Sequence, residues 1–225
     1  MPADRLLVFA RRPAPGKVKT RLTPPLAPED AATIYEACLR DVVTHAARER
    51  GRVELWYAGG RKADAWFARE FQSMHHQRQS SGALGERLAD AFARSFADGG
   101  ERVIILGGDV PTLPESTLTS AFTDLEDADG VVGPSLDGGY VLIGLRHATW
   151  PRGRTLFQDI PWSTEHVLSV TLLRAGEAGL DMRLLPGWYD VDRVADLERA
   201  KADAAPDSHL GRWLRSEAAR NVQGL

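Results

Sequence analysis

The sequence predicts an α/β protein with a mostly parallel central sheet flanked by helices on both faces. Short apolar runs alternate with longer segments of helical periodicity, and the apolar runs end in glycine, proline or charged residues. The chain has 225 residues, of which 43% are apolar, enough for one large core. Because no internal repeat or long linker interrupts this order, we expect a single domain over residues 1–225.

The first hundred residues open with a compact apolar run at 5–10, which predicts a buried strand leading into a loop with Pro13, Pro15 and Gly16. From Pro28, apolar residues recur at spacings of three and four, which predicts a helix that Gly51 ends. The next expected elements are a strand at 53–58, a short helix over about 63–70, a polar stretch at 74–80 and an amphipathic helix at 84–96.

The second half begins with the clearest buried strand of the chain, residues 102–106, which runs into Gly107-Gly108-Asp109. A helix is expected after Pro114, and two short strands at 130–134 and 140–145 flank a turn at 137–139. A helix over about 163–178, a strand at 182–185 and a helical C-terminus from Arg193 complete the expected order.

Composition excludes several classes of partner and site. The 28 basic and 31 acidic residues give a net charge of −3, which predicts neither a nucleic-acid polymer nor an anionic membrane as partner. No stretch approaches the roughly 18–20 apolar residues of a membrane span, and we expect a soluble, unprocessed, cytoplasmic protein. The single cysteine, Cys38, excludes an internal disulfide framework and is expected in the core. The six histidines have no metal-ligand spacing.

A basic loop follows the first expected strand. Its basic residues and glycine are Arg11, Arg12, Gly16, Lys17, Lys19 and Arg21. Basic side chains and exposed backbone N–H groups favour binding of a di- or triphosphate, although a solvated basic loop is the alternative. It is not a Walker loop, because Val18 follows Gly16-Lys17.

Two acidic positions follow other expected strands. Asp109 comes directly after the most apolar strand, where a carboxylate suits Mg²⁺ or Mn²⁺; a turn or cap aspartate is the alternative. Asp190 and Asp192 follow the strand at 182–185, and a carboxylate from this remote segment would complete a metal site, although Asp192 could instead cap the next helix.

Two further segments have an ordinary structural interpretation beside a functional one. The turn Asp137-Gly138-Gly139 before Tyr140 suits a hairpin. Ser163-Thr164-Glu165 suits a helix N-cap, and Trp162 suits either a staple beside it or a platform for stacking a sugar.

Taken together, six segments resemble one family. They are residues 9–22, 82–92, 107–111, 133–145, 162–164 and 189–192, in this order and across nearly the whole chain. The chain resembles the bacterial GT-A-type glycosyltransferases, some of them placed in arsenosugar biosynthesis. It is more distantly similar to the phospholactate guanylyltransferase and molybdenum-cofactor nucleotidyltransferase groups.

The resemblance implies a Rossmann-like GT-A fold of the nucleotide-diphospho-sugar transferase type, and roles for particular residues. The nucleotide would be bound by Ala10, Arg11, Gly16, Lys17, Lys19, Arg21, Gly82, Gly85 and Arg87. A Mg²⁺ or Mn²⁺ ion would be held by Asp109 with Asp192 or Asp190. The sugar or acceptor would face Asp137, Gly138, Gly139, Tyr140 and Trp162, with Asp109 and Asp137 as catalytic residues.

The implied activity is transfer from a nucleotide-activated donor to a small acceptor. Glycosyl transfer from a nucleoside-diphosphate sugar is the first hypothesis, with Asp137 as a general base. The second is nucleotidyl transfer from a nucleoside triphosphate, because the Asp-x-Asp motif of many GT-A glycosyltransferases is absent at Asp109. A non-catalytic nucleotide-binding domain is the third. The oligomeric state, the base and the acceptor stay open.

Overall fold

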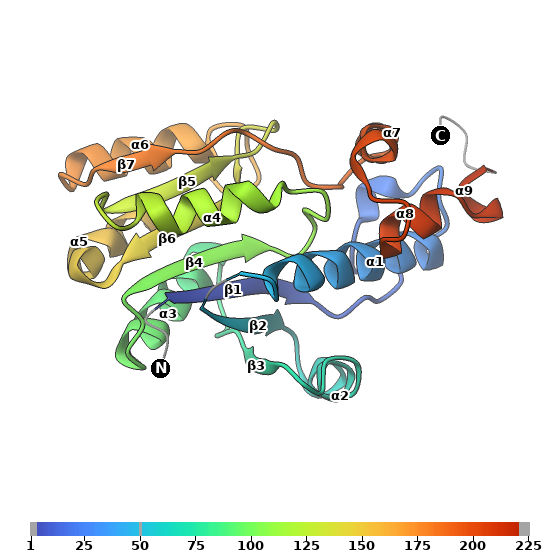
Figure 1. Ribbon diagram of the computed structural model, residues 1–225, viewed down its shortest axis with the longest axis horizontal. Coiled ribbons are helices and arrows are strands. Elements are labelled where there is room, and N and C mark those ends of the chain that lie inside the picture. The colour runs from blue at the N-terminus through green and yellow to red at the C-terminus, as the bar shows by residue number, and fades with distance from the viewer. Residues whose placement is uncertain (1–3, 50, 221–225) are drawn as a thin grey trace.

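A computed structural model of the chain describes residues 4–49 and 51–220. Its strands are β1 (Asp4–Arg11), β2 (Arg52–Ala58), β3 (His75–Arg78), β4 (Arg102–Gly107), β5 (Gly130–Pro134), β6 (Tyr140–Arg146) and β7 (Met182–Leu184). They form one sheet in the order β3-β2-β1-β4-β6-β5-β7, in which β6 alone runs antiparallel to its neighbours. The predicted mostly parallel α/β architecture is confirmed (Figure 1).

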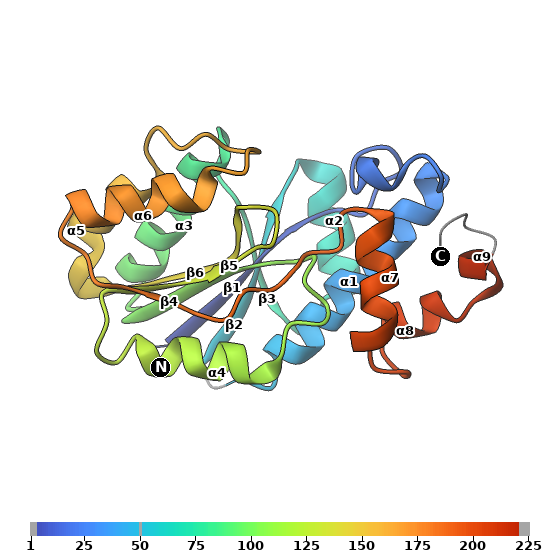
Figure 2. The ribbon, with the colours of Figure 1, turned by 90° about the horizontal axis from the view of Figure 1, so that it is seen from above.

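Helices cover both faces of the sheet (Figure 2). One face packs against α1 (Pro28–Ala46), α2 (Arg61–Glu70) and α4 (Glu115–Asp124). The other packs against α3 (Leu84–Ala97) and α6 (Val167–Glu177), with the short α5 (Trp150–Gly153) and flanking 3₁₀ turns. Side chains alternate between the faces along each strand, so Leu6 and Val8 of β1 enter the first core layer and Leu7 the second.

A third apolar cluster lies beyond the sheet, on the outer side of α1. It joins α1 to the C-terminal helices α7 (Val194–Asp203), α8 (His209–Leu214) and α9 (Glu217–Arg220). The buried Asp41 of α1 accepts hydrogen bonds from the backbone N–H groups of His209 and Leu210, both at 2.8 Å, and so satisfies the first turn of α8. Cys38 lies in this cluster, fully buried as predicted.

Several predicted boundaries were wrong. Helix α1 ends at Ala46 rather than at Gly51, and α6 begins at Val167 rather than at residue 163, where Ser163 has a φ of 68° that a helix excludes. The polar stretch at 74–80 contains β3, an edge strand. Because an edge strand has a neighbour on one side only and can face water, it needs no apolar pattern.

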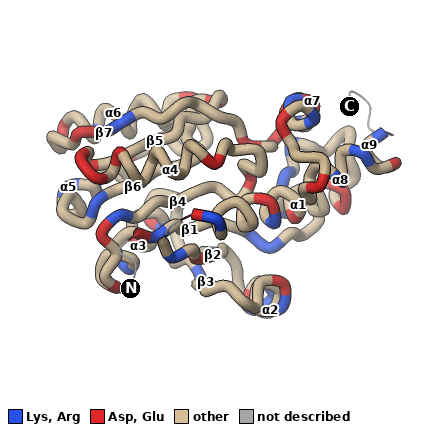
Figure 3. Tube along the Cα trace, in the orientation of Figure 1, with Lys and Arg blue, Asp and Glu red and all other residues tan. Residues whose placement is uncertain are grey.

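Acidic and basic residues are interspersed along the chain, as Figure 3 shows. Among the described residues, no helix is long and apolar enough to cross a membrane.

Candidate functional site

A cavity of about 800 Å³ opens at the carboxyl edge of the sheet, beside the adjacent ends of β1 and β4. Strand order reverses between these two strands, because the chain moves from β1 to β2 on one side and returns to β4 on the other. Such a switch point, at the carboxyl ends of the strands, is where open α/β sheets bind ligands.

The basic loop after β1 lines one side of the cavity and is anchored by its apolar residues. Val18, Leu22 and Leu26 are buried, and a 3₁₀ turn (Thr20–Leu22) begins directly after Lys19. Lys19 itself has φ 47° and ψ 42°, a left-handed conformation that is uncommon outside glycine and asparagine. The buried anchors hold this conformation, which turns the Lys19 side chain inward.

Asp109 stands just beyond β4 because two glycines precede it. The N–H of Gly108 donates to the carbonyl of Phe9 at 2.9 Å, which ties the end of β4 to β1. A Cβ at Gly108 would lie 3.0 Å from both that carbonyl oxygen and Leu39, so a larger residue would separate the two strand ends.

The acidic segment 189–192 alternates between core and cavity. Tyr189 and Val191 are buried, and the Val191 N–H donates to the Asp109 carbonyl at 2.9 Å. In an extended segment this alternation turns Asp190 and Asp192 to the same side, toward the cavity. Asp192 does not cap α7, because Asp196 accepts the N–H groups of residues 192 and 193 instead.

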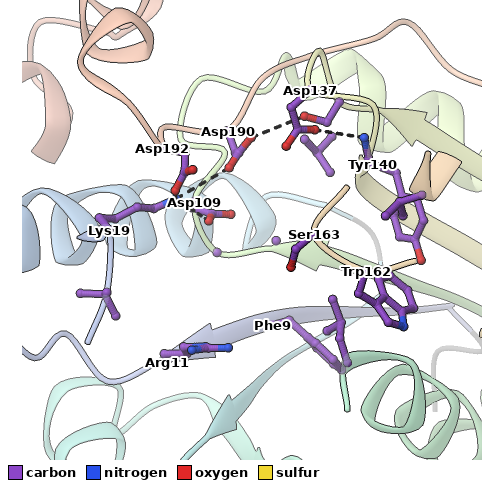
Figure 4. Close-up of a pocket in the computed structure, with 18 of the residues that line it drawn as sticks. Phe9, Arg11, Lys19, Asp109, Asp137, Tyr140, Trp162, Ser163, Asp190 and Asp192 are labelled. Carbon is purple, nitrogen blue, oxygen red and sulfur yellow. Dashed lines mark hydrogen bonds and ion pairs between the residues drawn. The ribbon is translucent and has the colours of Figure 1, made fainter. Parts of the chain in front are cut away.

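The Lys19 ammonium lies among the carboxylates of these segments (Figure 4). Its Nζ is 2.7 Å from Asp109, 3.5 Å from Asp192 and 3.7 Å from Asp190, and its side chain is 5% exposed. Arg21 adds an ion pair to Asp192 at 2.8 Å. We call Lys19, Asp109, Asp190 and Asp192 the lysine–aspartate cluster.

The cluster shifts the pKa values of its members in opposite directions. Burial lowers the pKa of Lys19, but the three carboxylates outweigh burial and raise it well above its usual value. Burial and the neighbouring Asp109 carboxylate raise the pKa of Asp190 to about 6. Burial also acts to raise the pKa of Asp192, yet Lys19 and Arg21 hold it below its usual value.

The cluster currently holds an ammonium group rather than a formed metal cage. Among residues 4–49 and 51–220, no three His, Cys, Asp or Glu side chains are arranged to hold a metal ion as they stand. The three aspartates nevertheless supply hard carboxylate oxygens around one cationic centre, which is the donor chemistry that Mg²⁺ and Mn²⁺ prefer.

Aromatic side chains line another part of the cavity. Tyr140 and Trp162 meet edge to face, with ring centroids 6.3 Å apart, and both line the cavity. Burial raises the pKa of the Tyr140 hydroxyl far above its usual value, so this group stays neutral. Asp137 also lines the cavity, and its Oδ1 accepts the Gly139 N–H at 3.0 Å.

Arg87 of α3 lines a third part of the cavity. Its guanidinium donates to Gln79 Oε1 at 2.9 Å, and the buried Gln79 in turn donates to the carbonyl of Trp56 at 2.7 Å. The pKa of Arg87 is lowered by burial and by the neighbouring Arg11. Sequence reasoning did not select Gln79, because this residue lies in the stretch where no strand was expected.

Most of the predicted site residues meet in this one cavity. Its lining includes Ala10, Arg11, Lys17, Lys19, Arg21, Arg87, Asp109, Asp137, Gly139, Tyr140, Trp162, Asp190 and Asp192. It also includes residues that sequence reasoning missed, among them Tyr35, whose hydroxyl accepts the Arg11 N–H at 2.9 Å. A tyrosine on the buried stripe of α1 is the only sequence signal for that contact.

The remaining predicted glycines do not line the cavity and have backbone roles. Gly16, Gly82 and Gly138 have φ values of 67°, 110° and 89°, which favour glycine. Gly85 is a close-packing position, since a Cβ there would lie 2.4 Å from the carbonyl oxygen of Phe157.

Known proteins share this fold and part of this sequence. A family model described as "Uncharacterized protein conserved in bacteria (DUF2064)" matches residues 41–164, more than half of the chain. The chain belongs to this family. A structure from Desulfovibrio desulfuricans G20, which bears the provisional name nucleotide-diphospho-sugar transferase, is 31% identical with a TM-score of 0.91, over 97% of this chain and 96% of that chain.

Two further matches extend the comparison. The 2-phospho-L-lactate guanylyltransferase of Methanothermobacter thermautotrophicus is 29% identical over 185 residues, which are 80% of this chain and 76% of that protein. The 4-diphosphocytidyl-2C-methyl-D-erythritol synthase of Anaerococcus prevotii is 8% identical with a TM-score of 0.59, over 89% of this chain and 96% of that chain. The fold is therefore that of nucleotide-diphospho-sugar transferases and cytidylyltransferases, and the predicted resemblance is confirmed.

The raised pKa of Asp190 makes a prediction about stability. The pKa is about 6 in the folded state and near 3.8 when unfolded, so ionised Asp190 costs stability at high pH, and this cost is relieved as pH falls from 6 to 4. We expect Asp190→Asn to raise the free energy of unfolding by about 1–3 kcal/mol at pH 8, with the gain shrinking toward pH 4. Urea unfolding across this range measures it, and a gain that does not change with pH would contradict it.

Proposed function

We propose that this protein is a metal-dependent transferase that uses a nucleotide-activated donor, and that it transfers a nucleotidyl group from a nucleoside triphosphate to a small phosphorylated or hydroxylated acceptor. The observation that carries the proposal is the lysine–aspartate cluster. It brings a buried ammonium and carboxylates from two remote segments to the switch point of the sheet, beside the basic loop.

The charge of the cavity suits a triphosphate. Its basic lining residues are Arg11, Lys17, Lys19, Arg21, Arg87 and Arg193. Five acidic residues, Asp109, Asp137, Glu165, Asp190 and Asp192, line it as well, so the cations would serve the phosphates where a divalent cation neutralises the aspartates. A nucleoside triphosphate, with roughly four negative charges against roughly two for a nucleoside-diphosphate sugar, would then make fuller use of the six cations. The guanylyltransferase relative, 29% identical, transfers a nucleotidyl group by its name.

The local structure around Asp109 also favours nucleotidyl transfer. The first carboxylate of an Asp-x-Asp motif would stand at Gly107, and a Cβ there would lie 2.9 Å from Asp109 Oδ1. A side chain at residue 107 would therefore displace the Asp109 carboxylate from its present position. Further metal ligands would then come from elsewhere, and Asp190 and Asp192, which line the same cavity, would supply them.

A divalent cation would be held by Asp109, Asp190 and Asp192. When bound, it would neutralise charge on the phosphates and so favour departure of pyrophosphate. Because the Lys19 ammonium lies at the centre of the same carboxylates, Lys19 must share them with the metal or leave them. A lysine released from the carboxylates would be free to contact the phosphates.

The other residues of the chain would bind and orient the reactants. Arg11, Lys17 and Arg21 would hold the triphosphate from the basic loop, and Arg87, steered by Gln79, would face the nucleoside end. An acceptor oxygen would then attack the α-phosphorus while the bond to pyrophosphate breaks. Asp137 lines the cavity near Asp190, where its carboxylate would take a proton from a hydroxyl acceptor.

Glycosyl transfer is the second candidate. The paired rings of Tyr140 and Trp162 offer an aromatic wall of the kind on which sugars stack. The Desulfovibrio desulfuricans relative, 31% identical, also carries a nucleotide-sugar name. In this reaction an acceptor hydroxyl would attack the anomeric carbon and the nucleoside diphosphate would leave.

The leaving group distinguishes the two reactions. We expect pyrophosphate release when the protein is incubated with GTP, CTP, ATP or UTP, Mg²⁺ or Mn²⁺ and a panel of small acceptors that includes 2-phospho-L-lactate. Coupled pyrophosphate detection and mass spectrometry of the product measure it. Acceptor-dependent release of a nucleoside diphosphate from a nucleotide sugar would favour glycosyl transfer instead, and no product from either donor class would favour a non-catalytic nucleotide-binding domain.

Asp109→Asn tests the carboxylate at the strand end. We expect kcat/KM to fall at least about 100-fold because the charge that holds the metal is lost, while the melting temperature changes little. The exposed Asp207→Asn is the control for removing one acidic charge. Full activity in Asp109→Asn would overturn the catalytic role, and a large loss of stability would indicate a structural one.

Lys19→Met tests the competition between ammonium and metal. Without nucleotide, we expect this variant to bind Mn²⁺ at least about tenfold more tightly than wild type in calorimetry, because no ammonium occupies the carboxylates. Lys17→Met is the matched control, since Lys17 is an exposed lysine of the same loop with no ion pair to a described residue. Equal affinities in wild type and Lys19→Met would exclude competition.

A further inference from the structure

A second, smaller pocket lies beside the basic loop, between that loop and the start of α2. It has a volume of about 360 Å³ and is lined by Arg11, Arg12, Ala14, Lys17, Val18, Ala58, Gly59, Gly60, Lys62 and Ala63. Arg11, Lys17 and Val18 line the large cavity too, whereas Arg12 and Lys62 line the small pocket alone. The basic loop is therefore a wall that the small pocket and the large cavity share.

Charge distinguishes this pocket from the rest of the surface. Four cationic side chains, those of Arg11, Arg12, Lys17 and Lys62, line it, and no acidic residue does. None of the four forms an ion pair with a described residue, although the chain as a whole has a net charge of −3. The nearest acid on α2, Asp64, is already paired with Arg78 and Tyr57.

Four like charges around one concave space repel each other unless an anion lies between them. The floor of the pocket leaves room for such an anion, because a Cβ built on Gly60 would meet no atom within 4 Å. Paired guanidinium groups match the oxygen geometry of phosphoryl groups, and four cations suit a dianion or a more highly charged group. The volume suits a small molecule rather than a whole nucleotide.

We propose that the small pocket is a separate binding site for a small phosphorylated anion, either pyrophosphate or a phosphomonoester. The site does not require the transfer reaction, so the proposed function and this proposal can fail independently. Because Arg11 and Lys17 line both spaces, an anion in the small pocket shares cations with any phosphate in the large cavity. The two ligands therefore weaken each other's binding, reciprocally.

The test uses the full chain and two probes, pyrophosphate and glycerol 3-phosphate, titrated by calorimetry without metal. We expect at least one probe to bind wild type, and the double variant Arg12→Ala/Lys62→Ala to lose at least tenfold in affinity for it. Arg61→Ala is the matched control, because Arg61 begins α2 beside Lys62 but does not line the pocket. We expect this variant to stay within twofold of wild type.

Hydrogen exchange locates the bound probe. We expect it to slow exchange in residues 58–64 of wild type but not of the double variant, whose unchanged circular dichroism would verify folding. Binding of pyrophosphate alone would identify a polyphosphate site, and binding of glycerol 3-phosphate would identify a phosphomonoester site. The proposal is overturned if neither probe binds wild type, if the double variant binds as wild type does, or if protection is confined to residues 107–110 and 188–193.

Discussion

The ion pairs of Lys19 hold the candidate site together. This one ammonium contacts carboxylates from the end of β4 and from the segment before α7, while belonging to the loop after β1. Three stretches of chain that are remote in sequence therefore meet at a single charge. Without it, three aspartates at the same strand edge would repel each other in partly buried surroundings, where repulsion is stronger than in water.

Buried ion pairs such as those of Lys19 are poor evidence that the fold is stabilised. Removing charges from water costs free energy that the attraction between them often does not repay, and the raised pKa of Asp190 indicates that its ionisation is unfavourable here. The cluster has three acids and one lysine, and even with Arg21 the acids remain in excess. Because the carboxylates outnumber the cations, the electrostatic potential at the cluster is negative. A negative potential suits the replacement of one bound cation by another.

The sequence predicted the strands and helices that depend on a local pattern of apolar residues. Buried strands such as residues 102–106 and amphipathic helices such as 84–96 are fixed by which side chains enter the core, so their periodicity is visible in the chain itself. The edge strand at His75–Arg78 was missed because pairing with β2, not apolar side chains, defines it. The start of α6 was misplaced because Ser163-Thr164-Glu165 has the residue types of a helix N-cap, whereas Ser163 adopts a positive φ that a helix excludes.

The site was predictable as a set of residues but not as a set of contacts. Asp109 and Asp192 could be proposed for one site because the carboxyl ends of parallel strands share an edge. That Lys19 would lie between them could not be predicted, since it depends on a left-handed backbone at that residue. The resemblance supplied roles for the glycines, whereas the structure gives Gly85 and Gly138 contacts with backbone that leave no room for a side chain.

The basic loop and the acidic segment are positioned by the same apolar cluster. Leu22 and Leu26 from the loop are buried together with Tyr189 and Val191 from the segment, and α1 and the C-terminal helices complete the cluster. Leu22, Tyr189 and Val191 each lie next to a charged residue that lines the cavity, so packing on one side positions charges on the other. The C-terminal helices contribute no side chain to the cavity beyond residue 193, yet they cover this cluster. Their contribution to the site is thus to support, by apolar packing, the two loops of opposite charge that the Lys19 ion pairs bring together.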